Sequence, residues 1–263
     1  MSDKNSSFIN LSDLPDSIDN AVKNLTDKPT QGIGQTFSDV WYLVFGGITQ
    51  VADKRRMKYA HDLELYRQEL SQAISSIPKE NLIEPNVQTT AQALENSKYC
   101  IESEELRKLF VNLISKSMDN NYVSNVHPSF AEIIKQMSPI DAKIFKNLHP
   151  DYIFPLVDYV LENRRTLSSE IKLSTVYISP LSDIDLKMAS FSISSLERLG
   201  LIAIDMNSSC TNKSVYLPYE ETAFYRNLSS EAIRLYASKR ASIYKYLGYF
   251  TPLGKNFFEV CVK

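Results

Sequence analysis

The chain has 263 residues, of which 43% are hydrophobic and 23% are charged, so it has enough apolar material for one large core or two modest ones. Its formal net charge is −2, so charge alone does not predict a general affinity for nucleic acid or anionic membranes. Only seven glycines, together with abundant leucine, isoleucine, lysine and glutamate, favour a mainly α-helical fold over an all-β sandwich.

Residues 1–30 are polar and rich in serine, aspartate and asparagine, which predicts a flexible arm with at most one short helix over residues 14–25. The first residues lack the basic start and the apolar core of a signal peptide, so we expect the protein in the cytoplasm. Cys100, Cys210 and Cys261 are odd in number and have no metal-binding spacing, as expected for reduced thiols. We therefore expect neither a metal site nor a cofactor.

Thr36 or Ser38 can cap a helix where the polar arm gives way to apolar residues. The three- and four-residue spacing that follows predicts one long amphipathic helix, which bends at Gly46-Gly47 and is ended by Pro78. This helix carries the one dense basic run of the chain, a candidate contact for phosphate or for an acidic partner. The run consists of Lys54, Arg55, Arg56 and Lys58. A solvated helix face would explain the same run.

The predicted helix begins with an aromatic stretch that is a candidate interaction surface, made by Trp41, Tyr42 and Phe45. Self-association through this stretch is one interpretation, although core packing would use the same side chains. The apolar run is about a dozen residues long and a membrane span needs about 20, so stable insertion is not predicted. Perturbation of a membrane by the segment from Trp41 to Ile48 stays open as an alternative.

Two further helices are predicted over residues 87–99 and 103–118. Ser103 is the expected N-cap of the second, and Glu104 and Glu105 suit the positive end of its helix dipole. An acidic first turn explains these carboxylates without catalysis, so a catalytic pair formed by Glu102 and Glu105 is the weaker interpretation.

The stretch NVHPSFAEIIKQMSPID, residues 125–141, indicates a helix, a break and a second helix. Pro128 suits the first turn of one helix, and Ser138 with Asp141 resembles the capping box that starts the next. We interpret His127 as a residue that ties down the loop before the first of these helices through hydrogen bonds. A cryptic enzyme, with His127 as base and Cys100 as nucleophile, is an alternative that the sequence leaves open.

The C-terminal half contains the sequence pattern of a winged-helix domain. A helix in KMASFSISSLERLG ends at Gly200, the strand LIAID follows, and a later strand over residues 246–250 leads into TPLGK. Residues 220–245 are expected to form an additional helix. In winged-helix domains the helix before the first wing strand often enters the major groove of DNA. Here that helix offers Lys187, Ser192, Ser194, Ser195 and Arg198.

Acidic residues accompany these candidate recognition side chains, namely Asp183, Asp185 and Glu197. Sequence-specific DNA-binding proteins normally display a clear basic face, which this half of the chain lacks. A winged helix that contacts a protein or a second copy of the chain is therefore favoured over one that binds DNA.

Several of these stretches together resemble a bacterial family known as abortive infection alpha, over about residues 30–263. The most distinctive are SKYCIESEELRKLFVNLISKSMDN and VHPSFAEIIKQMSPIDAKIF, supported by SLERLGLIAID and YFTPLGKNFFEVCV. The signature residues in this chain are Glu104, Glu105, Arg107, His127, Pro128 and Phe130. The resemblance implies a part in resistance to bacteriophage in a bacterial host, and it supplies no catalytic residue.

Motifs of nucleotide-binding proteins, serine hydrolases and zinc proteases are missing from the sequence. We therefore interpret the chain as a flexible arm (1–30), a helical module (31–138) and a winged-helix-like domain (139–263), mainly α with a small β component. The leading hypothesis is a non-enzymatic antiphage protein that acts through protein contact or self-association. The alternatives are a DNA-binding regulator, a membrane-perturbing effector and the cryptic enzyme.

Overall fold

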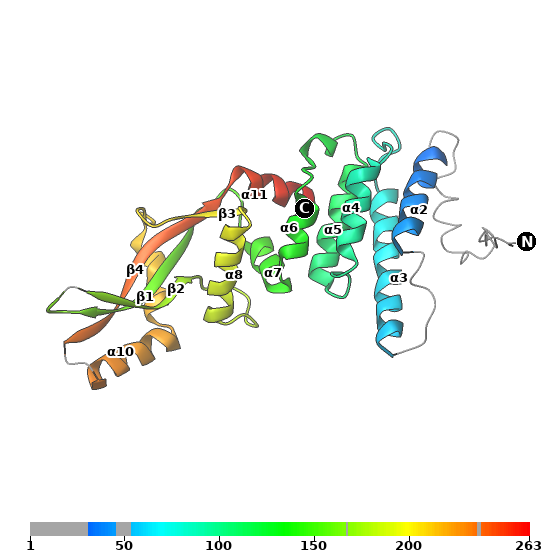
Figure 1. Cartoon of the computed structure of the whole chain (residues 1–263). Coiled ribbons are helices and arrows are strands. Elements are labelled where there is room, and N and C mark those ends of the chain that lie inside the picture. Colours follow the sequence, from blue (N-terminus) through cyan, green and yellow to red (C-terminus); the bar gives the residue numbers. More distant parts are fainter. Residues whose placement is uncertain (1–30, 46–53, 167, 236–237) are drawn as a thin grey trace, which may run out of the picture.

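The structure is a computed structural model that describes residues 31–45, 54–166, 168–235 and 238–263 (Figure 1). The predicted arm over residues 1–30 and the predicted bend at Gly46-Gly47 lie outside the described residues. The described part is mainly α-helical and contains one small antiparallel sheet, so the predicted class, mainly α with a small β component, is confirmed.

Helices make up the N-terminal part of the structure and pack side by side (Figure 1). They are α2 (Gln31–Phe45), α3 (Lys54–Ser75), α4 (Val87–Ser97), α5 (Glu104–Ser117), α6 (Phe130–Gln136) and α7 (Pro139–Asn147). Local capping chemistry fixes several of their starts. The Ser103 side chain accepts a hydrogen bond from the Leu106 amide at the start of α5, and Ser138 and Asp141 form the predicted capping box of α7.

The prediction of one long helix up to Pro78 was wrong, because α2 and α3 are separate helices that pack on each other. The Trp41 and Phe45 rings lie 5.7 and 6.4 Å from the ring of Tyr66. A continuous helix rises 1.5 Å per residue, so it would hold these rings on the order of 30 Å apart. The helical periodicity of the sequence continues from α2 into α3. Burial of the aromatic face of α2 against α3 nevertheless determines the structure. In addition, α2 begins at Gln31, before Thr36 and Ser38.

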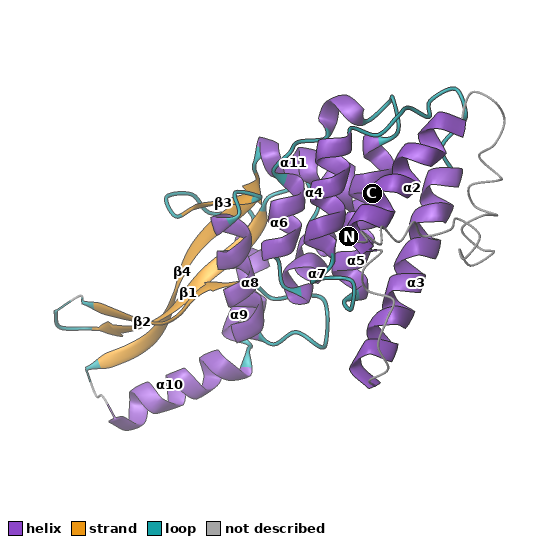
Figure 2. Ribbon diagram, turned by 45° about the vertical axis from the view of Figure 1, so that its right-hand side comes forward, coloured by secondary structure: helices purple, strands orange, loops and turns teal. Residues whose placement is uncertain are grey.

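The C-terminal part contains a four-stranded antiparallel sheet with the order β2-β1-β4-β3 (Figure 2). The strands are β1 (Phe154–Asn163), β2 (Ser169–Val176), β3 (Ile202–Asp205) and β4 (Lys239–Phe250). The strand LIAID and the end of β4 were predicted, whereas β1 and β2 were missed. The helix expected over residues 220–245 was only partly right, because α10 (Ala223–Leu235) covers part of that range and β4 begins within it, at Lys239.

Strand β1 is central and apolar because cores cover both of its faces. Leu156 belongs to the large core cluster shared with the helices, including α8 (Leu186–Arg198). Val157, Tyr159 and Leu161 belong to a second cluster formed with residues around α10 and the short helices η3 (Lys213–Tyr216) and α9 (Leu217–Glu220). A strand buried on both sides reads as a continuous apolar run, which does not alternate and is hard to tell from a buried helix.

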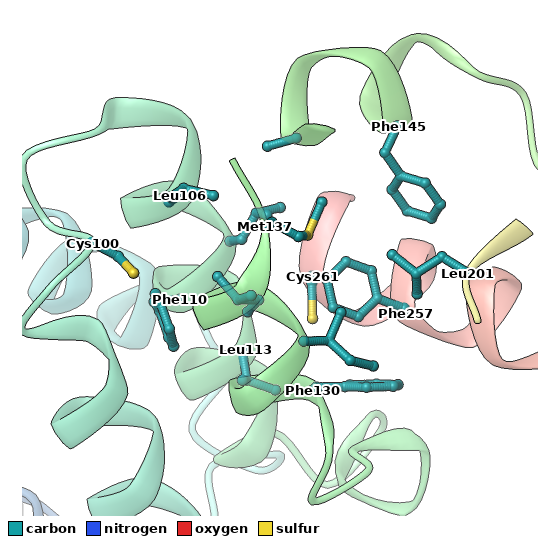
Figure 3. Packing of buried hydrophobic residues seen from close by; sticks show 14 of the residues in the cluster. Cys100, Leu106, Phe110, Leu113, Phe130, Met137, Phe145, Leu201, Phe257 and Cys261 are labelled. Atoms are coloured by element: carbon teal, nitrogen blue, oxygen red, sulfur yellow. The ribbon is translucent and has the colours of Figure 1, made fainter. Parts of the chain in front are cut away.

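The C-terminal end of the chain packs back onto the N-terminal helices, through α11 (Pro252–Phe257) and the π-helical turn η4 (Phe258–Val262). The Phe257 ring meets Phe130 of α6 edge-on at 5.2 Å, and the Asn112 side chain donates a hydrogen bond of 2.9 Å to the Cys261 carbonyl oxygen. Figure 3 shows Phe130, Phe257 and Cys261 within one buried cluster. The large core therefore runs across residue 138, and the division into modules there stays a prediction.

Candidate interaction surface on helix α8

Helix α8 has well-defined ends, which fix the directions of its side chains. The Asp185 side chain accepts a hydrogen bond of 2.8 Å from the Met188 amide at the N-terminus. At the C-terminus Gly200 has φ +74°, a left-handed conformation that glycine adopts without steric cost, and it ends the helix as predicted. Ala189, Ile193 and Leu196 point into the large core. The remaining faces of α8 meet α7, strand β2 and solvent.

One side of α8 is joined to α7 through the buried carboxylate of Asp141. Ser192 Oγ donates to Asp141 Oδ1 at 2.6 Å, and Ser195 Oγ donates to Asp141 Oδ2 at 3.1 Å. The same Oδ2 accepts the Ser138 amide hydrogen bond of the capping box at 2.8 Å. Ser192 is only 1% exposed. The hydroxyls of Ser192 and Ser195, two of the predicted recognition residues, are thus used in the contact between two helices, and their part in recognition stays a prediction.

The other side of α8 is joined to strand β2 at Thr175, the one residue other than glycine with positive φ (+49°) in the described part of the chain. This backbone conformation costs a β-branched residue about 1–3 kcal/mol. Four groups hold it in place. The Thr175 amide donates to Asp158 Oδ1 (2.9 Å) and to the Tyr246 hydroxyl (2.8 Å), and its Oγ1 lies 3.0 Å from Ser194 Oγ and 3.4 Å from Ser190 Oγ. The sheet and α8 are thereby fixed to each other.

Tyr246 gives this network a pH dependence that a mutation can test. Burial, together with the neighbouring Asp158 carboxylate, raises the pKa of Tyr246 above its ordinary value of 10.0. The unfolded chain therefore loses this proton first as pH rises. Stability from this group is complete below about pH 10, and above that pH the free energy of unfolding falls by about 1.4 kcal/mol per pH unit.

With Tyr246→Phe, the fall in the free energy of unfolding above pH 10.0 is expected to be shallower by about 1.4 kcal/mol per pH unit. Urea unfolding at a series of pH values measures the slope. Between about pH 7 and pH 9 the tyrosine is protonated in both states, so wild type and variant should there show the same pH dependence. Equal slopes above pH 10.0 would show that Tyr246 ionises as freely in the folded protein as in the unfolded chain.

The solvent-exposed face of α8 is a stripe of four side chains that includes an aromatic ring. The stripe consists of Lys187, Phe191, Ser194 and Arg198, at positions i, i+4, i+7 and i+11 on one face of the helix. Phe191 is 74% exposed, and Met188 beside it is 38% exposed. Arg198 Nη1 donates to Gln136 Oε1 at 3.0 Å, which directs the guanidinium along the surface. An aromatic ring flanked by an arginine is typical of the residues that dominate protein–protein contacts.

The structure thus brings together three of the five predicted recognition residues, Lys187, Ser194 and Arg198. Phe191 was not among the predicted recognition residues, although it lies on the same predicted helix. Its spacing of four from Lys187 and seven from Arg198 is the signal that could have identified it. The ring lies on the same face as the two basic residues.

The predicted aromatic surface on α2 is divided by the structure. Trp41 and Phe45 are buried in the large core, against Tyr66. Tyr42 is exposed, and its exposed neighbour is Leu43. The alternative role of Trp41 and Phe45 in core packing therefore applies to this structure. A membrane contact through Phe45 would require α2 to leave α3.

The predicted basic cluster lies in the first turns of α3. Of its four members, Lys54, Arg55 and Arg56 have side chains outside the described ones. Lys58 is exposed and forms an ion pair with Glu102, with an N–O distance of 3.4 Å. An exposed pair of this kind contributes little to stability, and it leaves the ammonium group accessible.

The acidic and basic signature residues of α5 have structural contacts. Arg107 is nearly buried, and its guanidinium makes two parallel hydrogen bonds to Glu69 of α3, at 2.9 and 3.0 Å, and a third to the Ile101 carbonyl oxygen. The Glu69 carboxylate raises the pKa of Arg107 above its ordinary value. Glu105 accepts from Ser103 Oγ at 2.9 Å, and Glu104 pairs with Lys108. These contacts join α3 to α5 and complete the helix start.

His127 lies where the sequence placed it, at the loop before α6. The Nδ1 atom of His127 is 2.7 Å from Ser129 Oγ and accepts a hydrogen bond from the Ser129 amide. The centroid of the imidazole ring lies 5.9 Å from that of the Phe130 ring, and Pro128 follows His127 in the chain. These contacts agree with the interpretation that His127 ties down the loop. Cys100 is buried, which raises the pKa of its thiol. Among the described side chains no hydrogen bond joins His127 to Cys100.

Within the described residues, no group of three or more histidine, cysteine, aspartate or glutamate side chains is placed to hold a metal ion. None of the helices in the described ranges is long and apolar enough to cross a membrane. The three cysteines are buried and free.

Comparison with known proteins gives one match. A family model described as abortive infection alpha matches residues 58–261, from the first turns of α3 to the last turn of the chain. No curated protein and no solved structure matches the chain. The matched range contains α8, the Asp141 and Thr175 contacts and all six predicted signature residues, whereas α2 lies before it.

Proposed function

The chain belongs to the abortive infection alpha family, and from this membership we propose that it protects a bacterial host against phage through a protein contact, without catalysing a reaction. The observation that carries the proposal is the exposed ring of Phe191 between Lys187 and Arg198 on α8. The partner is a phage protein, a host protein or a second copy of the chain.

The surroundings of the stripe support its use as a binding surface. Contacts on both flanks of α8, to Asp141 and to Thr175, hold the helix rigidly, so a partner does not need to order it. An exposed phenylalanine contributes nothing to the core of this chain. In contact with a partner it would bury its whole ring, and such aromatic anchors dominate binding energies.

A non-enzymatic mechanism is supported by the structural use of the signature residues. Arg107 joins α3 to α5, and His127 orders the start of α6. We expect a variant with both His127→Ala and Cys100→Ala to protect cells against phage as well as the wild type does, provided that it is equally abundant. Loss of protection at wild-type abundance would favour the cryptic enzyme.

Photo-crosslinking tests the proposed contact. Phe191 is replaced by the photoreactive analogue p-benzoylphenylalanine, and cells are irradiated before and after infection. We expect a crosslinked product whose mass identifies a partner or a dimer. The control carries the same analogue in place of Tyr99, an aromatic side chain with a similar exposure of 78% on the loop between α4 and α5. Equal products from both positions, or none from position 191, would contradict the proposal.

DNA binding by a winged helix is the second candidate. It is supported by the path of the chain, because α8 ends at Gly200 and leads into β3, which pairs antiparallel with β4 like the two strands of a wing. Lys187 and Arg198 are exposed on the helix that would enter the groove. A mobility shift at moderate salt that is abolished by Lys187→Glu and Arg198→Glu, and unaffected by Phe191→Asp, would favour this candidate over protein contact.

A further inference from the structure

The far end of the sheet brings together two segments that are distant in the sequence. Asn163 pairs with Lys239 and Glu162 with Arg240, at the outer ends of β1 and β4. The Arg164 amide donates a hydrogen bond of 2.7 Å to the carbonyl oxygen of Ser238, the residue that precedes β4. In Figures 1 and 2 this end of the sheet projects away from the helical part of the molecule. We call it the ribbon tip.

The ribbon tip is basic, although the chain as a whole is slightly acidic. The described residues within 162–172 and 231–240 include six basic and three acidic side chains, whereas the whole chain has 29 lysines and arginines against 31 aspartates and glutamates. The basic residues are Arg164, Arg165, Lys172, Arg234, Lys239 and Arg240, and the acidic ones are Glu162, Glu170 and Glu231. An uneven distribution of this kind creates a local positive field that a net charge near zero conceals.

Three of these cations have no acidic partner among the described side chains. Glu170 pairs with Lys172 and, at 3.3 Å, with Lys239, while Glu162 pairs with Arg240 at 2.8 Å. By contrast, Arg164, Arg165 and Arg234 are exposed, and none of them forms an ion pair with a described residue. Their guanidinium groups are therefore available to an anion from outside the chain.

Local hydrogen bonds hold the backbone next to Arg164 and Arg165. The Asn163 side-chain oxygen accepts the Arg165 amide hydrogen bond at 2.9 Å and that of Thr166 at 3.3 Å, and Thr166 Oγ1 lies 2.8 Å from Ser168 Oγ. Asparagine turns of this type fix the backbone locally. The two arginines therefore project from a defined position at the end of a two-stranded ribbon.

We propose that the ribbon tip binds the phosphodiester backbone of a nucleic acid. Four of the ten arginines of the chain lie here, and the planar guanidinium group matches phosphate oxygens with two parallel hydrogen bonds. Serine, threonine and asparagine side chains surround them, and these residue types also donate hydrogen bonds to phosphate oxygens. Protein interfaces centre on aromatic anchors beside their arginines, and the described residues of the tip include no aromatic side chain, which makes an acidic protein the less suitable ligand. The tip lies beyond the part of β2 that contacts α8, so this site is separate from the stripe.

Fluorescence anisotropy with a short labelled DNA duplex tests the site in the full chain. We expect binding that weakens steeply between about 50 and 200 mM salt, because phosphate contacts release counterions. The variant with Arg164→Glu and Arg165→Glu is expected to bind at least about tenfold more weakly. Its plot of log affinity against log salt concentration should be less steep, by the contribution of about two phosphate contacts. The control variant carries Lys146→Glu and Lys213→Glu, which change the net charge equally at exposed positions outside the tip, and its affinity should stay close to that of the wild type.

Parallel titrations with single-stranded DNA and duplex RNA identify the form of nucleic acid that binds. Binding of either form supports the proposal if the variant with Arg164→Glu and Arg165→Glu no longer binds that form. Displacement of the duplex by polyglutamate as effectively as by unlabelled nucleic acid would instead indicate an acidic protein ligand and overturn the proposal. Equal weakening in both variants, or no binding by the wild type at low salt, would also overturn it. Circular dichroism and a variant with Arg164→Gln and Arg165→Gln, expected to bind at an intermediate strength, separate lost binding from lost folding.

Discussion

Replacing Gly254 with alanine is expected to lower the free energy of unfolding by about 3 kcal/mol or more, because the new methyl group has no room. A Cβ at this position would lie 1.8 Å from the Leu201 carbonyl oxygen and 2.7 Å from its carbonyl carbon. Both are backbone atoms, which cannot rotate aside. Two hydrogen bonds hold the start of α11 against this stretch of backbone. The Thr251 amide donates to the Leu201 carbonyl oxygen, and the Thr251 hydroxyl donates to the Gly200 carbonyl oxygen.

Gly200 provides the matched control for this prediction. Its added Cβ would meet only the end of the Leu253 side chain, at 3.7 Å, so the cost of Gly200→Ala comes from its φ of +74° and is expected to be about 1 kcal/mol. Urea unfolding of the two variants measures both costs. If Gly254→Ala is no more destabilising than Gly200→Ala, Gly254 of α11 does not lie this close to the Leu201 backbone.

Replacing Arg107 with methionine is the second change for which we expect a large effect, about 3 kcal/mol of stability. The Arg107 side chain is only 7% exposed, and it is held by two hydrogen bonds to Glu69 and one to the Ile101 carbonyl oxygen. Its removal leaves the partly buried Glu69 carboxylate without its cation. The exposed neighbour Lys108 is the control on the same helix, and Lys108→Ala should change stability by less than about 0.5 kcal/mol.

A double-mutant cycle separates the pair from the packing of the arginine stem. The variant with both Arg107→Met and Glu69→Met removes the two charges together, so it is expected to be more stable than Arg107→Met alone. Chemical denaturation of the four proteins gives the coupling energy. A loss of less than about 1 kcal/mol for Arg107→Met would show that the ion pair between α3 and α5 is not a main source of stability.

Helix starts were predictable from the sequence because their chemistry is local. Ser103 and the pair Ser138 and Asp141 lie within three residues of the amides that they cap, so their spacing carries the information. The class of the fold followed from composition in the same way. The second carboxylate contact of Asp141, to Ser192 on α8, spans 51 residues and had no signal in the spacing.

Long-range pairing accounts for what the sequence did not reveal. Strand β1 pairs with β4 some 80 residues later, and its apolar run shows no alternation because cores lie on both faces. The packing of α2 against α3 was missed for a similar reason, since the contact of Trp41 with Tyr66 depends on tertiary burial. The ribbon tip likewise arises only when residues near 164 and 239 meet in the sheet.

The candidate surface was predictable in part. Lys187 and Arg198 were identified because they lie on the helix before the first predicted wing strand, but the sequence could not show which neighbours that helix would bury. Ser192 and Ser195 turned out to face α7, and Phe191 turned out to face solvent. Which face of an amphipathic helix is free depends on the elements that pack on both sides of it, here α7 and β2.

Phage plating on cells that express Phe191→Asp tests most directly the claim that protection depends on the α8 stripe. Phe191 is exposed, so this change should leave stability within about 0.5 kcal/mol of the wild type while placing a charge at the centre of the contact. We expect protection to be lost, with plating efficiency restored to that of cells lacking the protein, whereas Tyr99→Asp, at the comparably exposed control position, should protect fully. Full protection by the Phe191→Asp protein at wild-type abundance would contradict the account.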